Sequence, residues 1–479
     1  MESSIPAIPY FLKQGLKYLW GAVPPSARFG RHYRRTRSFL NRSQWWSREE
    51  LERYQRMELE RVLRRAGEKI PYYRDLFAEL GIRAGHLKDH RILMELPFLT
   101  KEMVMENYDR LIDPGVRVRS TITISTGGTS GKQLKIMTSP AHRKVEDAFI
   151  WDLWGRVGFG PGSRRAVLRG NTVRTPSHRR TWKYDPRSKE LFLSVYDLDE
   201  ESLGLYWEKI KLYRPEFIHC YPSAIMVLAR FAARHRLKDP PPLKAVLTSS
   251  ENTYPRQREF VEEILRTRYF DLYGQTEQVV LAGECEVGGS YHIYPQYGYT
   301  EIIDTEGRPV TEDGGEGEIV GTGFINTIMP LIRYRTGDWG WLNKNKCACG
   351  RNYPRLRDIQ GRRAQETIVG KDGNSIPLAA VNSHSGIYDR VKQYQFVQDR
   401  QGKLVLLIVK DGGYTDRDTA AIIKELTGKL GESVDLSIEF RREIPRTKRG
   451  KFQFLIQKVG REGLAHSCQP LPVSNNRAD

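Results

Sequence analysis

The chain has 479 residues, more than one hydrophobic core usually organises, so we expect two or three domains. A hydrophobic fraction of 39% and an aromatic fraction of 10% exclude a disordered chain. The sequence has no apolar run of transmembrane length and no basic segment before an apolar core, so neither a membrane span nor a signal peptide is expected. Five cysteines without the pattern of a secreted disulfide framework indicate the reducing cytoplasm.

The formal net charge of +19 is concentrated in residues 28–42 and 164–189. A solvated basic surface explains it; the functional alternatives are attraction to anionic lipid or to an acidic polysaccharide intermediate. A nucleic-acid partner is not expected, because no recognised binding fold accompanies the charge. Residues 5–23 mix apolar and aromatic side chains with Lys13 and Lys17. This segment predicts either packing on the domain body or an interfacial helix, which would make the protein peripheral to the inner face of the membrane.

The first strong helix signal covers residues 48–66, with Ser47, Glu49 and Glu50 suited to its N-terminus. Beyond residue 140, helical and strand-like stretches alternate, which implies a layered α/β sheet with helices on both faces. Ligand-binding loops then lie beyond the carboxyl ends of the strands. The expected helices are 142–157, 201–213, 224–235 and 255–266, and the expected strands are 165–169, 217–220, 245–248 and 268–272.

From residue 290 short β runs at 291–294, 299–303 and 317–320 predict a small antiparallel, barrel-like subdomain. From residue 361 a new unit is expected, with a hairpin of strands 391–397 and 404–409, a helix at 420–428 and a strand at 437–440. The predicted division is an N-terminal extension (1–46), a core domain (47–360, with a β subdomain at about 285–358), a C-terminal domain (361–460) and a disordered tail (461–479).

A loop rich in glycine and hydroxyl side chains follows the alternating run at 120–124. Glycine tolerates positive φ, so such a loop can turn its backbone N–H groups toward a polyphosphate. A Walker-type P-loop is excluded, because Thr126 stands where the leading glycine belongs and Gln133 replaces the Mg²⁺-binding hydroxyl. Taken alone, the loop could also be a flexible linker. Its members are Ser125, Thr126, Gly127, Gly128, Thr129, Ser130, Gly131 and Lys132.

Further motifs follow this loop in order: Tyr273-Gly274-Gln275-Thr276-Glu277, Tyr334-Arg335-Thr336-Gly337-Asp338, Gly361-Arg362 and Pro445-Arg446-Thr447-Lys448-Arg449-Gly450-Lys451. Together, from about residue 49 to residue 460, they resemble the adenylate-forming superfamily of acyl-CoA synthetases and adenylation domains. The likeness is greatest to the phenylacetate–CoA ligase branch, through Pro97-Phe98-Leu99-Thr100-Lys101, and to its CapK-type relatives, through the ending Gly450-Lys451-Phe452-Gln453-Phe454.

The resemblance implies a large α/β domain with a small β subdomain, followed by a small mobile α+β C-terminal domain. It implies that a carboxylic acid and Mg·ATP give acyl-AMP and pyrophosphate, and that the acyl group then passes to a thiol, most simply that of coenzyme A. An alternative acceptor is an amine or a carrier in surface-polysaccharide assembly. A nonenzymatic nucleotide-binding scaffold is the alternative from another class.

The resemblance also implies roles for single residues. The catalytic candidates are Lys451 and Lys132, which compensate phosphate charge, Thr276 near phosphate oxygens, and Glu277, the expected Mg²⁺ ligand. ATP is expected to contact the loop 125–131, Ser250, Glu251, Tyr273, Gly274, Asp338 and Arg362, with Asp338 on the ribose hydroxyls and Tyr273 against adenine. Ala364 stands where the family commonly has an Asp or Lys hinge.

The acid is expected near Tyr221, Ser223 and Ser249. No charged residue other than Glu251 is evident there, which favours an aromatic or otherwise apolar acid.

Four side chains could form a metal site: Cys285, His292, Cys347 and Cys349. Three thiolates and one imidazole make a closed tetrahedral Zn²⁺ set of the structural kind. The alternative is that Cys347 and Cys349 are a chance pair of buried thiols. The separation of residues 285 and 347 is unlike that of a local zinc finger.

Overall fold

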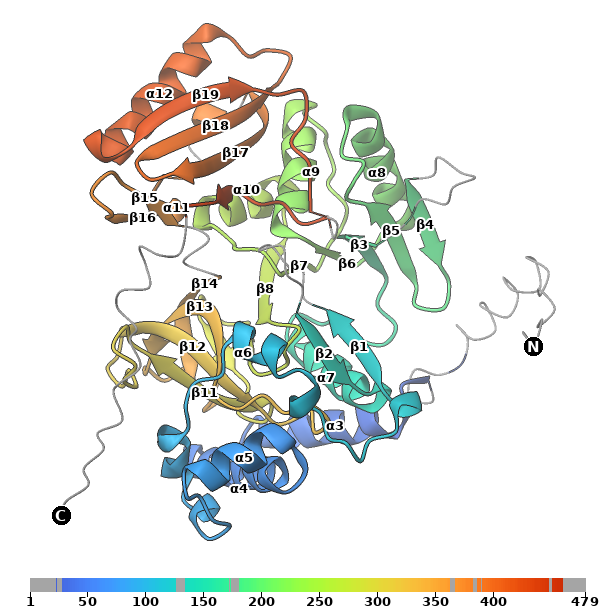
Figure 1. Cartoon of the computed structure of the whole chain (residues 1–479). Helices are drawn as coiled ribbons and strands as arrows, with labels where there is room; N and C mark the ends of the chain where they lie inside the picture. Colours follow the sequence, from blue (N-terminus) through green and yellow to red (C-terminus); the bar gives the residue numbers. More distant parts are fainter. Residues whose placement is uncertain are drawn as a thin grey trace, which may run out of the picture.

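The structure is a computed structural model that describes residues 23, 28–125, 134–171, 173, 181–361, 367–381, 386–388, 390–447 and 450–459. It has a large α/β body and a small α+β C-terminal domain, which confirms the predicted fold class (Figure 1). No helix in these ranges combines the length and the apolar character needed to cross a bilayer. Residues 5–22 lie outside the described part, so the expected membrane contact of that segment stays a prediction.

The N-terminal helices α3 (Gly30–Ser43), α4 (Arg48–Lys69) and α5 (Pro71–Glu79) pack on the body. The helix predicted over 48–66 is confirmed as α4. It begins with a capping box, in which the Ser47 hydroxyl accepts from the Glu50 N–H and the Glu50 carboxylate accepts from the Ser47 N–H. Helix α3 lies against α7 (Pro140–Gly155), and Arg37 pairs there with Asp152. Part of the basic N-terminal segment is therefore packed on the body.

The main sheet has twelve strands among the described residues. Its parallel part contains β5 (Glu190–Ser194), β3 (Arg165–Arg169), β6 (Phe217–Cys220), β7 (Ala245–Ser249) and β8 (Arg268–Gly274). The carboxyl ends of these strands share one edge. Strand β5 and the antiparallel edge strand β4 (Trp182–Asp185) were not predicted; β4 lies inside the basic stretch 164–189, and β5 follows that stretch directly.

Helices cover both faces of this parallel part, as predicted. Ile218 and Val246 belong to the core under α8 (Glu200–Tyr213), α9 (Pro222–Arg234) and α10 (Pro255–Leu265). Their chain neighbours Phe217 and Ala245 belong to the opposite core, which contains side chains of α3 and α7. This alternation is the period of two that a sheet buried on both sides requires.

The sheet continues antiparallel from β8 through β9 (Leu281–Glu284), β10 (Tyr291–Ile293), β14 (Arg355–Gln360), β13 (Tyr334–Asn343), β12 (Glu316–Gly323) and β11 (Gly298–Ile303). The three predicted β runs are confirmed as β10, β11 and β12. The expected barrel-like closure is not observed among the described strands, because β11 ends the sheet instead of pairing back. The antiparallel part is therefore an extension of the main sheet, bonded to it through β8 and β9.

Apart from the main sheet, β1 (Ile122–Ser125) and β2 (Lys135–Thr138) form a two-stranded antiparallel pair. The short helix α6 (Lys101–Glu106) begins at Thr100, whose hydroxyl accepts from the Met103 N–H.

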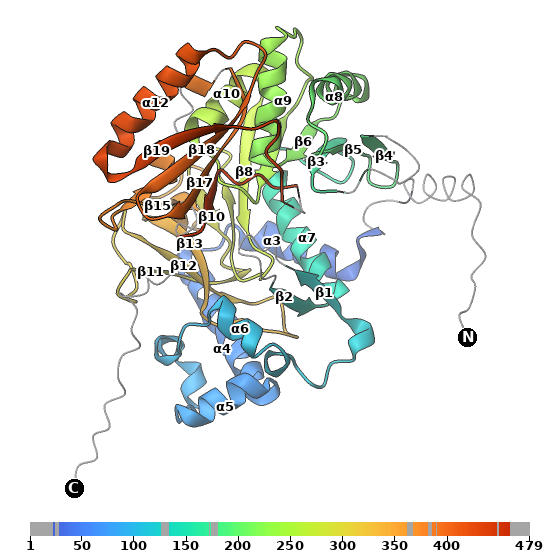
Figure 2. The same cartoon turned by 45° about the horizontal axis from the view of Figure 1, so that its top comes forward.

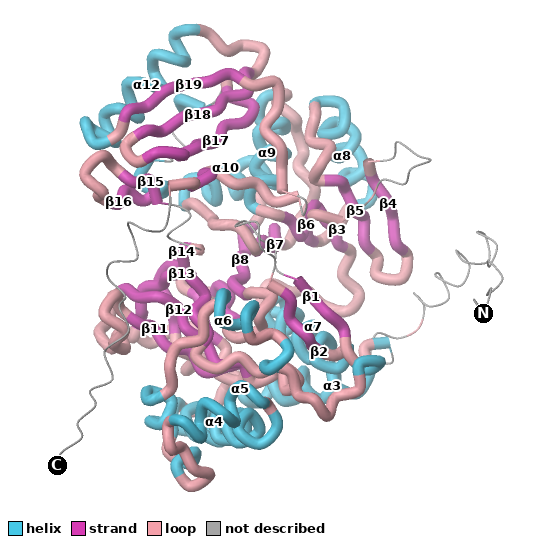
Figure 3. The backbone as a smooth tube through the Cα atoms, viewed as in Figure 1, coloured by secondary structure: helices cyan, strands magenta, loops and turns pink. Residues whose placement is uncertain are grey.

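The C-terminal domain has its own sheet, in the order β19 (Asp435–Phe440), β18 (Lys403–Lys410), β17 (Val391–Arg400) and β20 (Leu455–Gln457). Helix α12 (Asp416–Leu430) packs against this sheet, and Figure 3 shows the two as a separate layer beside the body. The smaller elements are β15 (Thr367–Val369), β16 (Ser375–Pro377) and α11 (Leu378–Val381). The predicted hairpin, helix and final strand are confirmed, each with longer bounds.

Candidate active site

A cavity of about 250 Å³ lies between the body and the C-terminal domain. It opens at the carboxyl ends of β7 and β8, the edge where the alternation of strands and helices placed the ligand loops. Figure 2 shows the C-terminal domain against α9 and α10 beside this edge. The predicted site residues that line the cavity come from four separate motifs: Ser250, Glu251, Tyr273, Gly274, Thr276, Glu277, Asp338 and Lys451.

Asp338 is held in place from two sides. The Tyr273 hydroxyl donates to its carboxylate at 2.8 Å, and its backbone N–H donates to the Thr336 hydroxyl at 3.0 Å. Burial raises the pKa of Tyr273 well above its ordinary value, and the nearby charge of Asp338 adds to this shift. Tyr273 is therefore a protonated donor, and Asp338 is a fixed carboxylate at the cavity wall.

The loop after β8 carries two further polar groups. The Glu277 carboxylate accepts from the Tyr334 hydroxyl at 3.1 Å. The side-chain amide of Gln275 is buried at the cavity, and neither its oxygen nor its nitrogen has a hydrogen-bond partner among the described residues. An unsatisfied buried amide is costly, so Gln275 fits a polar ligand or ordered water. Gln275 belongs to the motif Tyr273–Glu277, but its sequence position alone predicts no role for it.

Lys451 reaches the cavity from a tight loop of the C-terminal domain. Its N–H donates to the Thr447 hydroxyl at 3.1 Å, and its carbonyl accepts from the Thr447 N–H at 2.9 Å. Gly450 has a φ of +74°, and a Cβ there would lie 2.3 Å from the Val195 side chain and 3.2 Å from the Gly170 Cα. Only glycine fits this close approach, which seats the lysine loop against the body.

Glu251 joins the two domains. One carboxylate oxygen accepts from the Phe452 N–H at 2.8 Å, and the other accepts from the Ser223 N–H at 2.9 Å. Beside it Arg446 donates to the Ser223 hydroxyl and to the Gly450 carbonyl, both at 3.0 Å. Glu251 was expected to contact ATP; it lines the cavity, but both of its oxygens bind backbone N–H groups.

The expected acid pocket is more highly charged than the sequence indicated. The Arg169 guanidinium donates to the Ser249 hydroxyl at 2.6 Å and lies 4.6 Å from the centre of the Tyr221 ring. The hydroxyl of Ser223 accepts a hydrogen bond from the guanidinium of Arg446. The expectation that Glu251 is the one charged group there is therefore wrong. The sequence reading missed Arg169 because it lies far upstream, although the carboxyl end of a predicted strand was a usable signal.

Several predicted residues lie outside the described part of the chain: Thr126, Gly127, Gly128, Thr129, Ser130, Gly131, Lys132, Arg362 and Ala364. Ser125 is the last residue of β1 and pairs with Lys135 of β2, so the glycine-rich loop joins the two strands of a hairpin. Ser125 does not line the cavity, whereas Gly361, which precedes Arg362, does.

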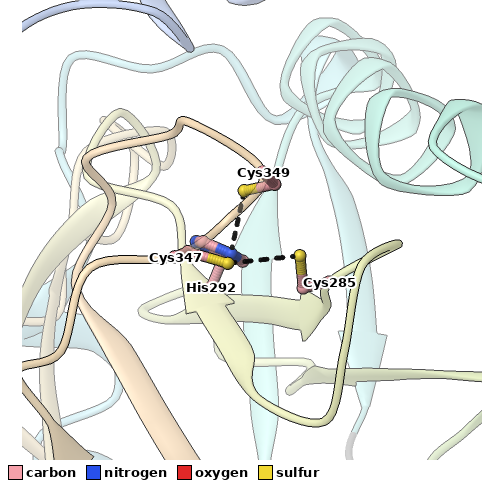
Figure 4. A group of neighbouring side chains, drawn as sticks. All are labelled: Cys285, His292, Cys347 and Cys349. Atoms are coloured by element: carbon pink, nitrogen blue, oxygen red, sulfur yellow. Dashed lines mark hydrogen bonds between the residues drawn. The ribbon is translucent and has the colours of Figure 1, made fainter.

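The four metal-ligand candidates lie together (Figure 4), and none of them lines the cavity. Cys285 and His292 come from the β9–β10 hairpin, and Cys347 and Cys349 come from the loop after β13. Their ligand atoms lie within 4.8 Å of one another, with 3.5 Å between the Cys285 and Cys347 sulfurs and 3.5 Å from the Cys349 sulfur to His292 Nε2.

The two separations of 3.5 Å are close to those between neighbouring ligands of a tetrahedral Zn²⁺ ion. Zinc bond lengths of about 2.3 Å to sulfur and 2.0–2.1 Å to nitrogen imply about 3.8 Å between two sulfurs and about 3.6 Å between sulfur and nitrogen. Burial lowers the pKa of His292 to about 3, so its imidazole is in the neutral form that binds metal.

Known proteins share this architecture. Residues 368–458 match the model of the CapK C-terminal domain. Protein CapK of Staphylococcus aureus is 24% identical over 404 residues, which cover 80% of this chain and 85% of that protein. The phenylacetate-coenzyme A ligase of Thermus thermophilus is 26% identical over 363 residues, which cover 74% of this chain and 80% of that enzyme.

Among solved structures, 2-hydroxyisobutyryl-CoA ligase in the postadenylation state, in complex with 2-HIB-AMP, matches with a TM-score of 0.66 and 20% identity. The match covers 84% of this chain and 88% of that one. The fold is therefore that of the adenylate-forming ligases, which confirms the resemblance found in the motifs. Within that fold, residues 368–458 match the CapK C-terminal domain, and the similar proteins include both CapK and phenylacetate-coenzyme A ligases.

Proposed function

We propose that this protein is an AMP-forming ligase that activates a carboxylic acid with ATP as acyl-AMP and then passes the acyl group to a thiol, most simply coenzyme A. The observation that carries the proposal is the single cavity that Lys451 shares with Asp338, Tyr273 and Glu277. Relatives named phenylacetate-coenzyme A ligase support the same reaction class.

In the first step a carboxylate oxygen attacks the α-phosphorus of ATP. A P–O bond to the acid forms, the bond to the bridging oxygen breaks, and pyrophosphate leaves with the electron pair. Negative charge gathers on the five-coordinate phosphorus, and a cation placed there lowers the barrier. Lys451 supplies this cation on the cavity wall, which makes it the catalytic residue of the proposal.

The nucleotide is proposed to lie along Tyr273 and Asp338. The fixed Asp338 carboxylate suits the two ribose hydroxyls, and the ring of Tyr273 suits the adenine face. Thr276 and Ser250 offer hydroxyls to phosphate oxygens, and Gly274 lets the backbone come close. Glu277 would hold Mg²⁺, since this ion takes one or two protein carboxylates and fills its remaining positions with phosphate oxygens and water. The loop 125–132, with Lys132, and Arg362 complete the proposed ATP contacts.

The acceptor of the second step follows from the relatives alone. Relatives named phenylacetate-coenzyme A ligase favour the thiol of coenzyme A. An amine or a carrier in surface-polysaccharide assembly is the second candidate, which the resemblance to CapK-type proteins implies. Both readings share the adenylation step. A cytoplasmic location, with contact at the inner face of the membrane, is proposed with them.

A Zn²⁺ ion is proposed at Cys285, His292, Cys347 and Cys349, in a structural role. Four protein ligands leave no open position for a substrate. When bound, the ion would tie the β9–β10 hairpin to the loop after β13, and its binding energy would contribute to folding of that region.

Pyrophosphate release tests the proposal. The purified full chain would be incubated with Mg·ATP and a panel of carboxylic acids, and then with coenzyme A, with the thioester detected by mass spectrometry. Acid-dependent release in the wild type, lost in Lys451→Ala and kept in Lys458→Ala, is the expected result; Lys458 is an exposed lysine of the same domain. ATP binding without release for any acid would instead favour the scaffold.

A further inference from the structure

Arg169 stands at the carboxyl end of β3 and reaches across two neighbouring strands. One terminal nitrogen donates to the Ser249 hydroxyl and to His219 Nε2, both at 2.6 Å, and the other donates to the Ser250 hydroxyl at 2.9 Å. His219 is on β6, and the two serines end and follow β7. The guanidinium is thus fixed over the ends of the central strands by one imidazole and two hydroxyl groups.

All three acceptors are neutral. Burial, together with the charge of Arg169, lowers the pKa of His219 well below its ordinary value, so the ring is an uncharged acceptor. Among the described residues no carboxylate pairs with Arg169. A guanidinium has five N–H groups, of which these contacts use three. Two N–H groups and a full positive charge are left for a ligand.

A role limited to linking the ends of the strands does not explain why this side chain is a cation. A half-buried cation without a counter-ion loses solvation, and neutral side chains could bridge the same hydroxyls without that cost. An anion from outside the protein would offset the cost, and the planar fork of arginine suits a carboxylate.

The position of Arg169 relates it to the reacting centre. Ser250, one of its acceptors, lines the cavity that contains Lys451, whereas Arg169 itself does not line it. The next residue, Gly170, is in contact distance of Gly450, which precedes Lys451. Arg169 therefore lies beside the catalytic lysine loop, next to the cavity residue Ser250 and to Tyr221 and Ser249 of the expected acid pocket.

We propose that Arg169 binds a second anionic group of the acid, distal to the carboxylate that is activated, so that the substrate class is a dicarboxylic or similarly acidic carboxylic acid. This inference rests on the proposed adenylation. It replaces the expectation of an apolar acid, which depended on the apparent lack of a cation in the pocket.

Matched acid pairs test the inference in the pyrophosphate-release assay. Glutarate is compared with pentanoate, and 4-carboxyphenylacetate with phenylacetate, since the members of each pair differ only by the second carboxylate. The wild type should prefer the diacids in kcat/KM by about tenfold or more. Arg169→Gln should lower kcat/KM for the diacids by about tenfold to 100-fold and leave the monoacids within about threefold.

Two further variants complete the test, one as a matched control and one as a substitute for a variant that does not fold. Arg164→Gln removes an exposed charge just before the other end of β3 and should keep the diacid preference. Should Arg169→Gln fail to fold in thermal unfolding, Arg169→Lys replaces it; this variant keeps the charge without the fork and should retain part of the preference.

Three results would overturn the inference. Wild-type protein that releases pyrophosphate equally with monoacids and diacids refutes it and leaves adenylation standing. Equal losses for both acid types in Arg169→Gln would assign Arg169 to the reacting carboxylate or to the fold. Folded wild-type protein that activates no acid at all would remove the proposed function and this inference with it.

Discussion

Replacing Glu251 with alanine should separate the two half-reactions. Its carboxylate holds the backbone on both sides of the domain boundary, at Ser223 and at Phe452, the residue after Lys451. Glu251→Ala removes both acceptors. It also removes the negative charge next to Arg446. Burial lowers the pKa of Arg446, and the charge of Glu251 partly offsets this shift, so the variant loses a group that stabilises the buried cation. The seated lysine loop should therefore be destabilised relative to a detached one.

The magnitude follows from the two contacts. A hydrogen bond to a charged group contributes about 1.5–3 kcal/mol, and the lower value applies here because Glu251 is only half-buried. Two such bonds give about 3 kcal/mol, or about 100-fold in the ratio of seated to detached loop. If the seated state is strongly favoured in the wild type, part of this free energy can be lost before the seated population falls. The rate of adenylation should therefore fall by about tenfold to 100-fold.

The assay follows both steps in the same preparations. Acid-dependent pyrophosphate release reports adenylation, and thioester formation from a supplied acyl-adenylate reports the second step. Glu251→Ala should reduce only the first. Glu259→Ala removes an exposed carboxylate of α10 as the matched control and should change neither. Unchanged adenylation, or equal losses in both steps, would refute the role of Glu251 as a tie for the lysine loop.

Three further substitutions test the other parts of the molecule. Lys451→Ala should lower pyrophosphate formation by orders of magnitude, since each ~1.4 kcal/mol of lost transition-state stabilisation is about tenfold, while transfer from a supplied acyl-adenylate falls far less; equal losses would contradict a lysine used only in adenylation. Asp338→Asn should raise the KM for ATP with the fold intact in thermal unfolding, and an unchanged KM would place the nucleotide elsewhere. Cys347→Ser should lower zinc content and thermal stability together, with activity lost only in proportion to folded protein. Elemental analysis of wild-type protein purified without chelators is the direct check, and less than about a tenth of an equivalent of zinc would end the metal proposal.

Much of the local structure follows from the sequence alone. The capping box at Ser47 starts α4, and the hairpin of β17 and β18 turns at Gly402, whose φ of +72° and crowded neighbours require glycine. Strand β6 has the bounds that its apolar run predicted. These features depend on side chains a few residues apart, so their physical causes can be read directly from the chain.

The residue types of the site were also evident, because each motif carries its chemistry within a few positions. What the sequence could not give is which motifs meet. Cys285 faces Cys347, and Glu251 binds the N–H of Phe452, across 62 and 201 positions. Such contacts depend on strand order and on the seating of one domain on another, which no local pattern encodes.

Arg169 shows the same limit most clearly. Its own sequence neighbourhood is a basic stretch that favoured a solvated surface, and β4 within that stretch was not predicted. Only the placement of β3 beside β6, with β7 next in the sheet, brings its guanidinium to His219, Ser249 and Ser250. The sequence determined the class of reaction through local motifs. The tertiary structure decided the charge beside Tyr221 and Ser249, where the acid is proposed to bind, because Arg169 comes from a strand far away in the chain.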